Sequence, residues 1–492
     1  MPRLTGIYLL LSTFSLIVVI SPQTSARAAA GFELQDDAAT HFNKAVGLYR
    51  SSKFDDALAE FELSLKANPP DPALVHNWIG FIYLRQAKYA EATDALEKAV
   101  KLKPASAEAW TNLGNAYLNS RRPDDAINAF KKVINIDPKS ANAHYNLGNV
   151  YSKINNLPEA VKSFQTAAQL NPDDPYIQNN LGYVFQKSGK LKEAIAAYDR
   201  ATKLMPKNAD YWVYLGLAYA DSRQPAVAKA TLQKAISLDP ENVTARLALA
   251  DTLNDMGQHA EAIVQLEKAR QIAPKDFMIS YRLGMLYKAS KNDAQAIAAF
   301  RRALDIRPDS AEALSALGQL LDRAMNYDEA IKIFRRQTEI ARDDPDAWGN
   351  LGAAYFHKNQ TEPAAQAWEE ALKRDSKRAD IRRWLAGYHL NRNDLDKAEQ
   401  EYTRSLKDAP NNAEALNNLG LIQDRRNNVD EAIKFYQKAI QANPRYEYAY
   451  NNLGVAFEKK GNNSEAVANY KKALAINPTF TDARKNLDRF KK

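Results

Sequence analysis

The feature that most constrains this chain is an internal repeat with a period of 34 residues. One alanine occupies the same place in thirteen successive segments, and eleven of the twelve spacings between these alanines are 34 residues, the other being 35. The alanines are Ala57, Ala92, Ala126, Ala160, Ala194, Ala228, Ala262, Ala296, Ala330, Ala364, Ala398, Ala432 and Ala466. A fixed period of this length is typical of a chain that stacks one supersecondary unit many times, so the repeat decides the fold.

The spacing within each repeat predicts two helices that pack against each other. Repeats that begin nineteen residues before each alanine span 38–72 and then twelve segments of 34 residues from 73 to 480. Position 7 is Leu or Ile and position 8 is Gly in ten of the thirteen repeats, position 24 is usually aromatic or Leu, and position 32 is Pro in eleven. Positions 4, 7, 8 and 11 share one face of a first helix, and positions 20, 24 and 27 share one face of a second. Small residues at positions 8 and 20 let the two backbones approach, and the proline ends the second helix.

The fold expected from these repeats is an all-α solenoid. A single helix pair cannot bury both of its apolar faces, so neighbouring repeats must stack. After the thirteenth repeat, residues 481–492 begin another first helix with Leu487 at position 7, but this segment is rich in charge. We therefore predict a short linker at 31–37, thirteen repeats at 38–480 and a C-terminal capping helix at 481–492.

The repeats resemble those of the tetratricopeptide repeat family. Residues Ala107 to Ser140, AEAWTNLGNAYLNSRRPDDAINAFKKVINIDPKS, fit the family signature at every diagnostic position except Val133, where alanine is usual. The resemblance covers nearly all of the chain after residue 37. It implies a right-handed superhelix of helix–turn–helix repeats, in which the first helices line a concave surface that commonly holds an extended peptide.

The first thirty residues are expected to lie outside the repeats. A basic start, an apolar run over 4–20 and a small-residue end together predict a secretory signal in residues 1–30, and cleavage after Ala28 and cleavage after Ala30 both fit the pattern. The alternative is an uncleaved membrane anchor, because the seventeen residues from Leu4 to Ile20 reach the lower limit for a spanning helix. The expected location is periplasmic or extracellular in the first case, and anchored to the inner membrane in the second.

Composition argues against catalysis, metal binding and nucleic-acid binding. The chain has no cysteine, which excludes disulfides, thiolate metal sites and a cysteine nucleophile. His41, His76 and His144 stand at position 4, where other repeats have Trp or Tyr, and are interpreted as packing residues rather than metal ligands. The formal net charge of +8 is spread over 492 residues and is too weak to indicate nucleic acid. We expect no enzyme activity, no catalytic residues, no metal and no cofactor.

The other stripe of the first helix, at positions 2, 5, 6, 9, 12 and 13, is predicted to face the groove. An amide offers donors and an acceptor, so a row of them can bind a peptide backbone or sugar hydroxyls without requiring charge. Asparagine at position 9, as in Asn115 and Asn149, is the stronger ligand candidate, whereas asparagine at position 6 suits structure and ligand binding equally well. The predicted groove residues are Asn112, Asn115, Tyr145, Asn146, Asn149, Asn179, Asn180, Tyr183, Asn417, Asn418, Asn451 and Asn452.

The segments NLGNAY and NLGNVY are similar to repeats in the superhelical arm of O-linked N-acetylglucosamine transferases. In that family an asparagine ladder binds substrate peptides. The resemblance implies the same binding mode for Asn112, Asn146 and Asn180. It does not imply the activity, because no glycosyltransferase domain is found in this sequence.

Repeats 9 and 10 depart from the pattern, because Arg342 and Ser376 replace the proline at position 32. The following stretch, KRDSKRADIRRW, contains six basic residues, which are Lys373, Arg374, Lys377, Arg378, Arg382 and Arg383. These residues form either a docking patch for an acidic partner or anionic polymer, or a loosened and solvated junction between degenerate repeats. Degenerate repeats are common in solenoids, which favours the junction.

The sequence as a whole favours a non-enzymatic scaffold or adaptor of the cell envelope that holds protein or peptide segments in its groove. A glycan partner is the first alternative, since a groove of amides and aromatic rings also suits sugars in a polysaccharide export or assembly system. A substrate-recruiting arm for a separate enzyme is the second. Membrane contact is expected only through an uncleaved N-terminus, and the oligomeric state stays open.

Overall fold

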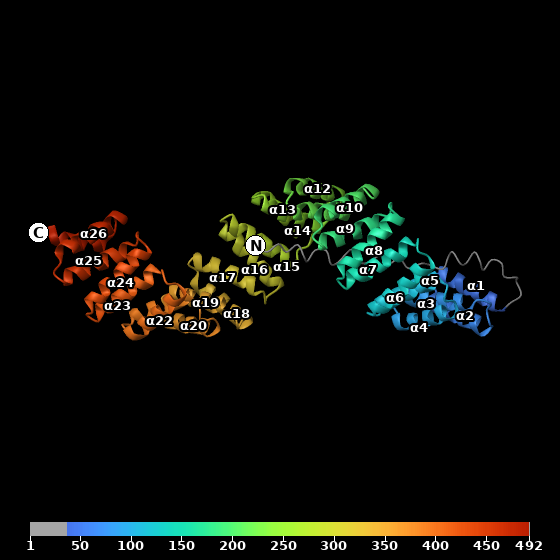
Figure 1. Ribbon diagram of the computed structural model, residues 1–492, viewed down its shortest axis with the longest axis horizontal. Coiled ribbons are helices and arrows are strands. Elements are labelled where there is room, and N and C mark those ends of the chain that lie inside the picture. The colour runs from blue at the N-terminus through green and yellow to red at the C-terminus, as the bar shows by residue number, and fades with distance from the viewer. Residues whose placement is uncertain (1–36, 492) are drawn as a thin grey trace. The chain divides into compact units, whose positions relative to one another are not determined.

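The computed structural model describes residues 37–491, which form 27 α-helices and end in the 3₁₀ turn η3, Arg489–Lys491 (Figure 1). No β-strand occurs in this range. The first 26 helices are thirteen consecutive pairs, and α27, Thr481–Asp488, follows them as the predicted cap. The all-α solenoid with a C-terminal capping helix is therefore confirmed. The predicted signal at 1–30, with both cleavage sites, and residues 31–36 of the predicted linker lie outside the described residues.

The chain divides into two compact bodies, Met1–Ala273 and Pro274–Lys492. The helices of the N-terminal body are α1 (Asp37–Arg50), α2 (Phe54–Lys66), α3 (Pro72–Arg85), α4 (Tyr89–Leu102), α5 (Ala107–Asn119), α6 (Pro123–Ile136), α7 (Ala141–Lys153), α8 (Leu157–Leu170), α9 (Pro175–Lys187), α10 (Leu191–Leu204), α11 (Ala209–Asp221), α12 (Pro225–Leu238), α13 (Val243–Asp255) and α14 (His259–Ile272). Before α27, the helices of the C-terminal body are α15 (Phe277–Ala289), α16 (Asp293–Ile306), α17 (Ala311–Arg323), α18 (Tyr327–Ile340), α19 (Pro345–His357), α20 (Thr361–Arg374), α21 (Ala379–Asn391), α22 (Leu395–Asp408), α23 (Ala413–Arg425), α24 (Val429–Ala442), α25 (Glu447–Lys459) and α26 (Asn463–Ile476).

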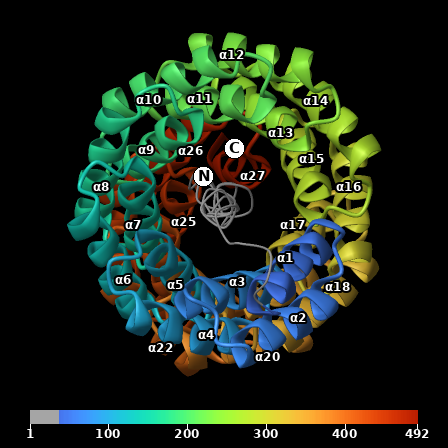
Figure 2. The ribbon, with the colours of Figure 1, turned by 90° about the vertical axis from the view of Figure 1, so that its right-hand side faces the viewer.

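Within each body, every helix packs against its pair partner and against the next helix along the chain. In the N-terminal body the odd-numbered helices lie on the inner side and the even-numbered helices on the outer side (Figure 2). Successive odd-numbered helices also touch, as α3 touches α5 in the N-terminal body and α23 touches α25 in the C-terminal body. We call the odd-numbered helices first helices and the side that they line the inner surface. Contacts limited to neighbours along the chain are the mark of a solenoid.

The core of most repeats is a contact between a glycine at position 8 on the first helix and the side chain at position 24 on the second. A Cβ atom added to Gly148 would lie 2.9 Å from the ring of Phe164, and one added to Gly114 would lie 2.7 Å from the ring of Phe130. Both rings are fully buried, so each occupies the space that a side chain at position 8 would need. The same contact joins Gly182 to Tyr198, Gly216 to Leu232, Gly284 to Phe300, Gly318 to Phe334, Gly352 to Trp368, Gly420 to Tyr436 and Gly454 to Tyr470.

At seven of the first helices, the side chain at position 4 ties the repeat to the one before it. The indole Nε1 of Trp110 donates to the backbone carbonyl of Pro104 (2.9 Å), and that of Trp212 donates to the carbonyl of Pro206 (3.0 Å). The corresponding bond to the carbonyl six residues back is made by Gln178, Arg246, Trp348, Arg382 and Arg484. These residues share a side-chain N–H donor and little else. Where position 4 carries such a donor, the donor closes the turn between repeats, which Leu314 and Leu416 at the same position cannot do.

The turn between the two helices of every repeat contains a residue in the left-handed conformation. Position 15 has φ between 57° and 75° in all thirteen repeats, but it is glycine only at Gly189, Gly257 and Gly461. The other residues there include Arg121 and Met325, with φ of 59° and 60°. Because a Cβ atom is unfavourable in this region, most of these turns carry backbone strain that the helices on either side impose.

Replacing Met325 by glycine should stabilise the protein, because glycine takes the left-handed conformation without the cost of a Cβ atom. We expect a rise of roughly 0.5–1 kcal/mol in the free energy of unfolding of the C-terminal body, measured as a higher midpoint in urea. The Met325 side chain is 74% exposed, so the substitution removes little packing. Met325→Ala keeps the strain and is the control, with a midpoint close to that of the original protein. An equal rise in both variants would contradict a backbone origin.

Candidate functional site

The predicted groove residues of repeats 3 to 5 lie on α5, α7 and α9, and all of them are buried. Their exposed fractions range from 0% for Asn112 and Asn115 to 9% for Tyr183. Asn149, the other strong ligand candidate, is 7% exposed. The expectation that positions 5, 6 and 9 face the groove freely is therefore not met in these repeats. The neighbouring first helices come close enough to cover these side chains.

Asparagine at position 6 forms a hydrogen-bonded ladder between first helices. Its Nδ2 donates to a side-chain oxygen at position 5 of the preceding repeat, so the bond joins two adjacent repeats. The bonds of this kind between asparagines are Asn112 to Asn77, Asn452 to Asn417 and Asn486 to Asn451, each 3.0 Å long. Asn77 on α3 and Asn486 on α27 were not among the predicted groove residues. The signal that identifies them is their pairing with asparagines 35 residues away, which no single helix displays.

The same ladder brings three predicted groove residues together between α7 and α9. Nδ2 of Asn180 donates both to the hydroxyl oxygen of Tyr145 and to Oδ1 of Asn149, each at 3.0 Å. Burial raises the pKa of Tyr145 to about 12, so the phenol is neutral at physiological pH. Nδ2 of Asn179 donates to Oδ1 of Asn180 at 3.4 Å. This cluster is a buried set of mutual hydrogen bonds inside the stack rather than an open row of amides, although Oδ1 of Asn179 has no partner among the described residues.

The ladder fails where position 5 cannot accept a hydrogen bond. The residue at position 5 before Asn418 is Arg383, whose guanidinium has only donors. Nδ2 of Asn418 turns instead to the hydroxyl of Tyr402, at 2.8 Å, and Nδ2 of Asn417 donates to Oδ1 of Asn418 at 3.3 Å. In α25, Nδ2 of Asn451 donates to Oδ1 of its neighbour in the same way. An arginine at position 5 thus redirects the asparagine of the following repeat to another acceptor.

Asn146 is the exception among the buried amides. It is 1% exposed, and neither its Nδ2 nor its Oδ1 has a hydrogen-bond partner among the described residues. The residue at position 5 of the preceding repeat is Thr111, whose hydroxyl donates to the carbonyl of Ala107 at 2.8 Å. The ladder bond is therefore missing between α5 and α7. Ligand binding by Asn146 and by the other predicted groove amides stays a prediction.

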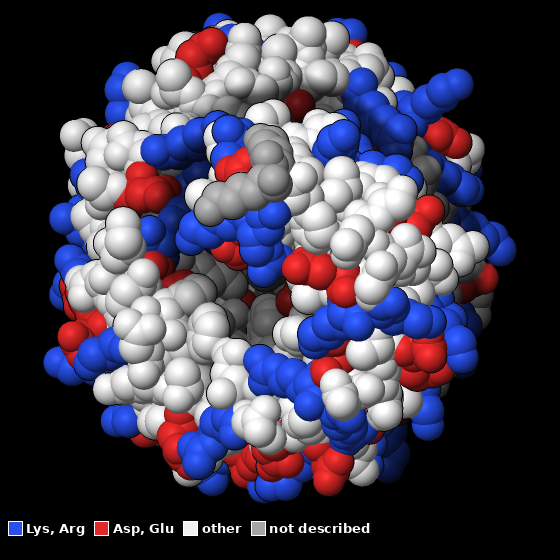
Figure 3. Space-filling view, turned by 90° about the vertical axis from the view of Figure 1, so that its left-hand side faces the viewer, with Lys and Arg blue, Asp and Glu red and all other residues white. Residues whose placement is uncertain are grey.

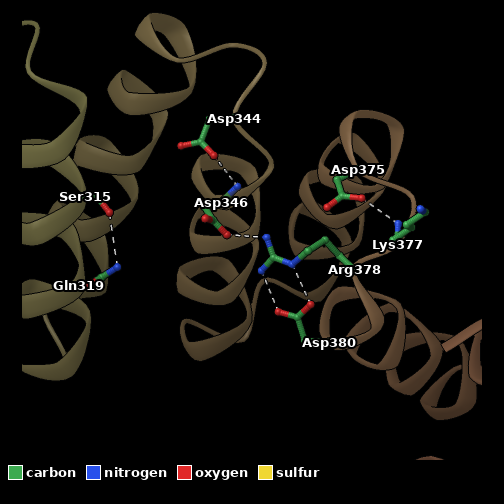
Figure 4. A network of polar contacts seen from close by, with 8 residues as sticks. All are labelled: Ser315, Gln319, Asp344, Asp346, Asp375, Lys377, Arg378 and Asp380. Atoms are coloured by element: carbon green, nitrogen blue, oxygen red, sulfur yellow. Dashed lines mark hydrogen bonds and ion pairs between the residues drawn. The ribbon is translucent and has the colours of Figure 1, made fainter. Parts of the chain in front are cut away.

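The predicted basic patch surrounds Arg378, whose guanidinium lies between two carboxylates (Figure 4). Its Nη1 donates to Asp346 at the start of α19, and its Nη2 lies 2.8 Å from Oδ2 of Asp380 in α21. The hydrogen bond from Arg378 holds the pKa of Asp380 below its usual range. The neighbouring Lys377 uses its backbone N–H to bond Asp375. This network ties α19 to the beginning of α21.

Four further basic side chains of this stretch, those of Lys373, Arg374, Arg382 and Arg383, are also paired with carboxylates. Glu370 pairs with both Lys373 (2.6 Å) and Arg374 (2.8 Å) within α20. The remaining pairs are Arg382 with Glu401 at 2.6 Å and Arg383 with Glu414 at 3.2 Å. The charge that would attract an anionic partner is thus largely neutralised inside the chain. On the face shown in Figure 3, basic and acidic side chains likewise lie next to one another rather than in areas of one sign.

Exposed aromatic side chains, absent from the predicted groove residues, occupy inner positions on α19 and α21. Phe356 at position 12 is 46% exposed and Trp384 at position 6 is 36% exposed. The ring centroid of each lies 5.8 Å from that of the buried Trp368 on α20. We call these three residues the aromatic patch. The signal that could have found it is the tryptophan at position 6, where repeats 3 to 5 have asparagine.

The described residues offer no group of three or more His, Asp or Glu side chains that could hold a metal ion. Two of the histidines make ion-pair contacts instead. Nδ1 of His41 lies 2.6 Å from Glu60, and Nδ1 of His357 lies 2.9 Å from Asp322. Both contacts join helices of the stack.

Family comparisons agree with the pattern of helix pairs. Models of the tetratricopeptide repeat match residues 253–320, 287–355, 350–413, 388–447 and 447–480. The model of the cilia and flagella-associated protein 70 C-terminal domain matches residues 72–280. The chain belongs to the tetratricopeptide repeat family. The finer resemblance to the arm of O-linked N-acetylglucosamine transferases stays a prediction.

Several solved structures are similar to this tetratricopeptide repeat protein. They include the APC/C hetero-tetramer Cut9–Hcn1, with 14% identity, a TM-score of 0.40 and coverage of 96% of this chain and 99% of that chain. YrrB, described as a TPR protein with an unusual peptide-binding site, has 27% identity, a TM-score of 0.33 and coverage of 39% and 98%. Yeast Tom70 has 17% identity, a TM-score of 0.34 and coverage of 85% and 94%. No protein with a curated description matches the chain.

Tetratricopeptide repeats are interaction modules, because a stack of helix pairs presents one long surface to a partner. The chain is accordingly a protein-interaction scaffold. Folds of this family are typically non-catalytic.

Substituting Asn180 by alanine should destabilise the N-terminal body, because it leaves the buried oxygens of Tyr145 and Asn149 without their donor. We expect a loss of roughly 1–3 kcal/mol in the free energy of unfolding, measured in urea. The matched control is Asn350→Ala, which also replaces a position-6 asparagine but removes no hydrogen bond to another described residue. Equal losses in the two variants would contradict a cohesive role for the ladder.

Proposed function

We propose that this protein is a non-enzymatic scaffold of the cell envelope or exterior that holds segments of partner proteins against its first helices. The observation that carries the proposal is the aromatic patch. Exposed rings at two inner positions favour a surface that is covered by a partner.

The envelope location is supported by the sequence of the first thirty residues, whose pattern is that of a secretory signal. No helix in residues 37–491 combines the length and the apolar character needed to cross a membrane. The location is tested by fractionating cells and sequencing the N-terminus of the protein. A new N-terminus at Ala29 or Gly31 in an exported fraction would support the proposal, and an intact Met1 in the cytoplasm would contradict it.

Partner binding on the inner surface is tested by photo-crosslinking in cells. A photoreactive amino acid at Phe356 should give adducts with other proteins, because this side chain is exposed on the inner surface. The same amino acid at Lys332, which is exposed on the outer helix α18, is the matched control and should give few. Adducts are read as mass-shifted bands and identified by mass spectrometry. Similar yields from both positions, or none from Phe356, would count against a scaffold that binds on its inner surface.

A second candidate function is glycan binding, which is favoured by an aromatic cluster near the C-terminus. The ring centroid of Tyr448 lies 5.0 Å from that of Phe480 and 5.6 Å from that of Tyr446, and Tyr448 is 50% exposed. Tyr446 and Phe480 stand at helix starts and provide no side-chain cap, although Ser140 does so at the same repeat position. An exposed ring beside polar groups is the usual platform for a sugar face.

The glycan alternative predicts that Tyr448→Ala weakens binding of acidic or neutral oligosaccharides about fivefold in calorimetry, since the loss of one aromatic contact is worth about 1 kcal/mol. Tyr176→Ala is the control, because Tyr176 is also an exposed tyrosine at position 2. No measurable binding of any oligosaccharide by the original protein would remove this alternative.

A further inference from the structure

Two neighbouring outer helices of the N-terminal body, α4 and α6, end in exposed apolar side chains (Figures 1 and 2). Leu102 ends α4 and is 54% exposed, more than any other large apolar side chain in residues 37–491 except Met325. Ile136 ends α6 and is 40% exposed. The last residues of α10, α12 and α14 are partly buried, namely Leu204, Leu238 and Ile272. The ends of α4 and α6 therefore present apolar surface that is better covered further along the stack.

Exposed lysines stand close to these two side chains on the same helices. One lysine lies four residues before Leu102 and another lies four residues before Ile136, so each shares a helix face with the apolar side chain. None of the four lysines in the second halves of these helices pairs with a carboxylate of residues 37–491, whereas Lys103 lies 2.7 Å from Asp71. The four are Lys98, Lys101, Lys131 and Lys132. We call these four lysines, together with Leu102 and Ile136, the α4–α6 surface.

Acidic side chains do not cancel the charge of the α4–α6 surface. The second halves of the two helices carry one acid, Glu97, against the four lysines. Glu97 accepts a hydrogen bond from the hydroxyl of Tyr117 at 2.8 Å and lies 4.0 Å from Arg122. Asp137, which follows α6, accepts a hydrogen bond from the backbone N–H two residues further on. The surface is therefore basic as well as partly apolar.

This combination favours a lipid surface over other partners. A lysine in the last turn also stabilises its helix through the macrodipole, but that role does not explain an exposed leucine beside Lys101. A soluble polyanion would contact the lysines and leave both apolar side chains in water. A membrane with anionic lipids uses both kinds of group, because apolar side chains enter the head-group boundary while lysines extend to the lipid phosphates.

We propose that the α4–α6 surface lies on a membrane that contains anionic lipids. Leu102 and Ile136 enter the head-group boundary, and the four lysines attract the lipid phosphates. The contact is peripheral and needs no spanning helix. It goes beyond the proposed function, because it gives the scaffold a membrane contact that does not depend on residues 4–20.

The first test is co-sedimentation of the purified exported protein with lipid vesicles. Binding to vesicles of phosphatidylglycerol and phosphatidylcholine should exceed binding to pure phosphatidylcholine at least tenfold, and about 0.5 M NaCl should remove most of it. Lys131→Gln/Lys132→Thr gives α6 the residues that α8 has at the same positions, Gln165 and Thr166, and should weaken binding about tenfold. Residues 4–20 would bind lipid themselves if they were retained, so the comparison of variants decides.

The matched control for lost charge is Lys153→Gln/Lys192→Gln. It removes two exposed lysines of the same body from the end of α7 and the start of α10. Binding of this variant to the mixed vesicles should change less than twofold. Equal losses in the two double variants would overturn a defined surface and leave only the general charge of the protein.

The second test follows the apolar side chains. The chain has no cysteine, so Leu102→Cys carries a single environment-sensitive fluorophore, whose emission should shift to the blue on the mixed vesicles. Val227→Cys is the control, because Val227 is 43% exposed near the start of α12 and should give no shift. Leu102→Ser/Ile136→Ser should weaken vesicle binding several-fold with a nearly unchanged urea midpoint, since both side chains are exposed.

Other outcomes would overturn the proposal. Equal binding to vesicles with and without phosphatidylglycerol would contradict a role for the lysines. If soluble polyphosphate competes with the vesicles and Leu102→Ser/Ile136→Ser binds them as well as the original protein does, the ligand is a polyanion rather than a lipid surface. Adducts from Phe356 in cells are independent of all these results, so the scaffold function stands or fails separately.

Discussion

The contact between the glycine at position 8 and the ring at position 24 sets the geometry on which the rest of the structure depends. Gly148 has no side chain, so the ring of Phe164 lies directly on the backbone of α7 and the two helices of the repeat come close together. The same contact recurs along the chain, so successive pairs stack in a similar way. Neighbouring first helices then bring position 6 within hydrogen-bond distance of position 5 in the preceding repeat. The amide ladder is therefore a consequence of close packing between helices.

Burial makes this ladder selective. An amide removed from water loses its hydrogen bonds to solvent and needs a partner on the neighbouring helix. Tyr145 and Asn417 supply an oxygen at position 5, and the asparagine of the following repeat donates to it. Arg383 supplies only donors, and Asn418 turns to Tyr402 instead. The contact between two repeats thus depends on a pair of residues that lie on different helices.

The sequence alone predicts the helix pairs, their stacking and the cap, because the 34-residue period is visible along the chain and the glycine at position 8 recurs in most repeats. It does not predict the burial of Asn149 and Asn180. A helical wheel treats one helix at a time. Asn149 and Asn180 are 31 residues apart in sequence and bond each other across adjacent repeats, so a wheel of either helix does not show that they are covered. The left-handed turns are missed for another reason, since Arg121 and Met325 carry no mark of that conformation. Both the burial of these amides and the left-handed turns are imposed by neighbouring helices, so the local sequence does not predict them.

The interruption of the ladder and the exposure of the aromatic patch have one cause. Where Trp384 replaces asparagine and Gly349 removes the acceptor, the amide bond between first helices is impossible, and the large ring contacts Trp368 and remains partly in solvent. The repeats at this point still need contacts that hold them in register. Arg378, bonded to carboxylates on α19 and α21, supplies one such contact, and Arg382 supplies another by pairing with Glu401. The basic residues thus join repeats where amides are absent, and this leaves the inner surface between them free to present apolar rings.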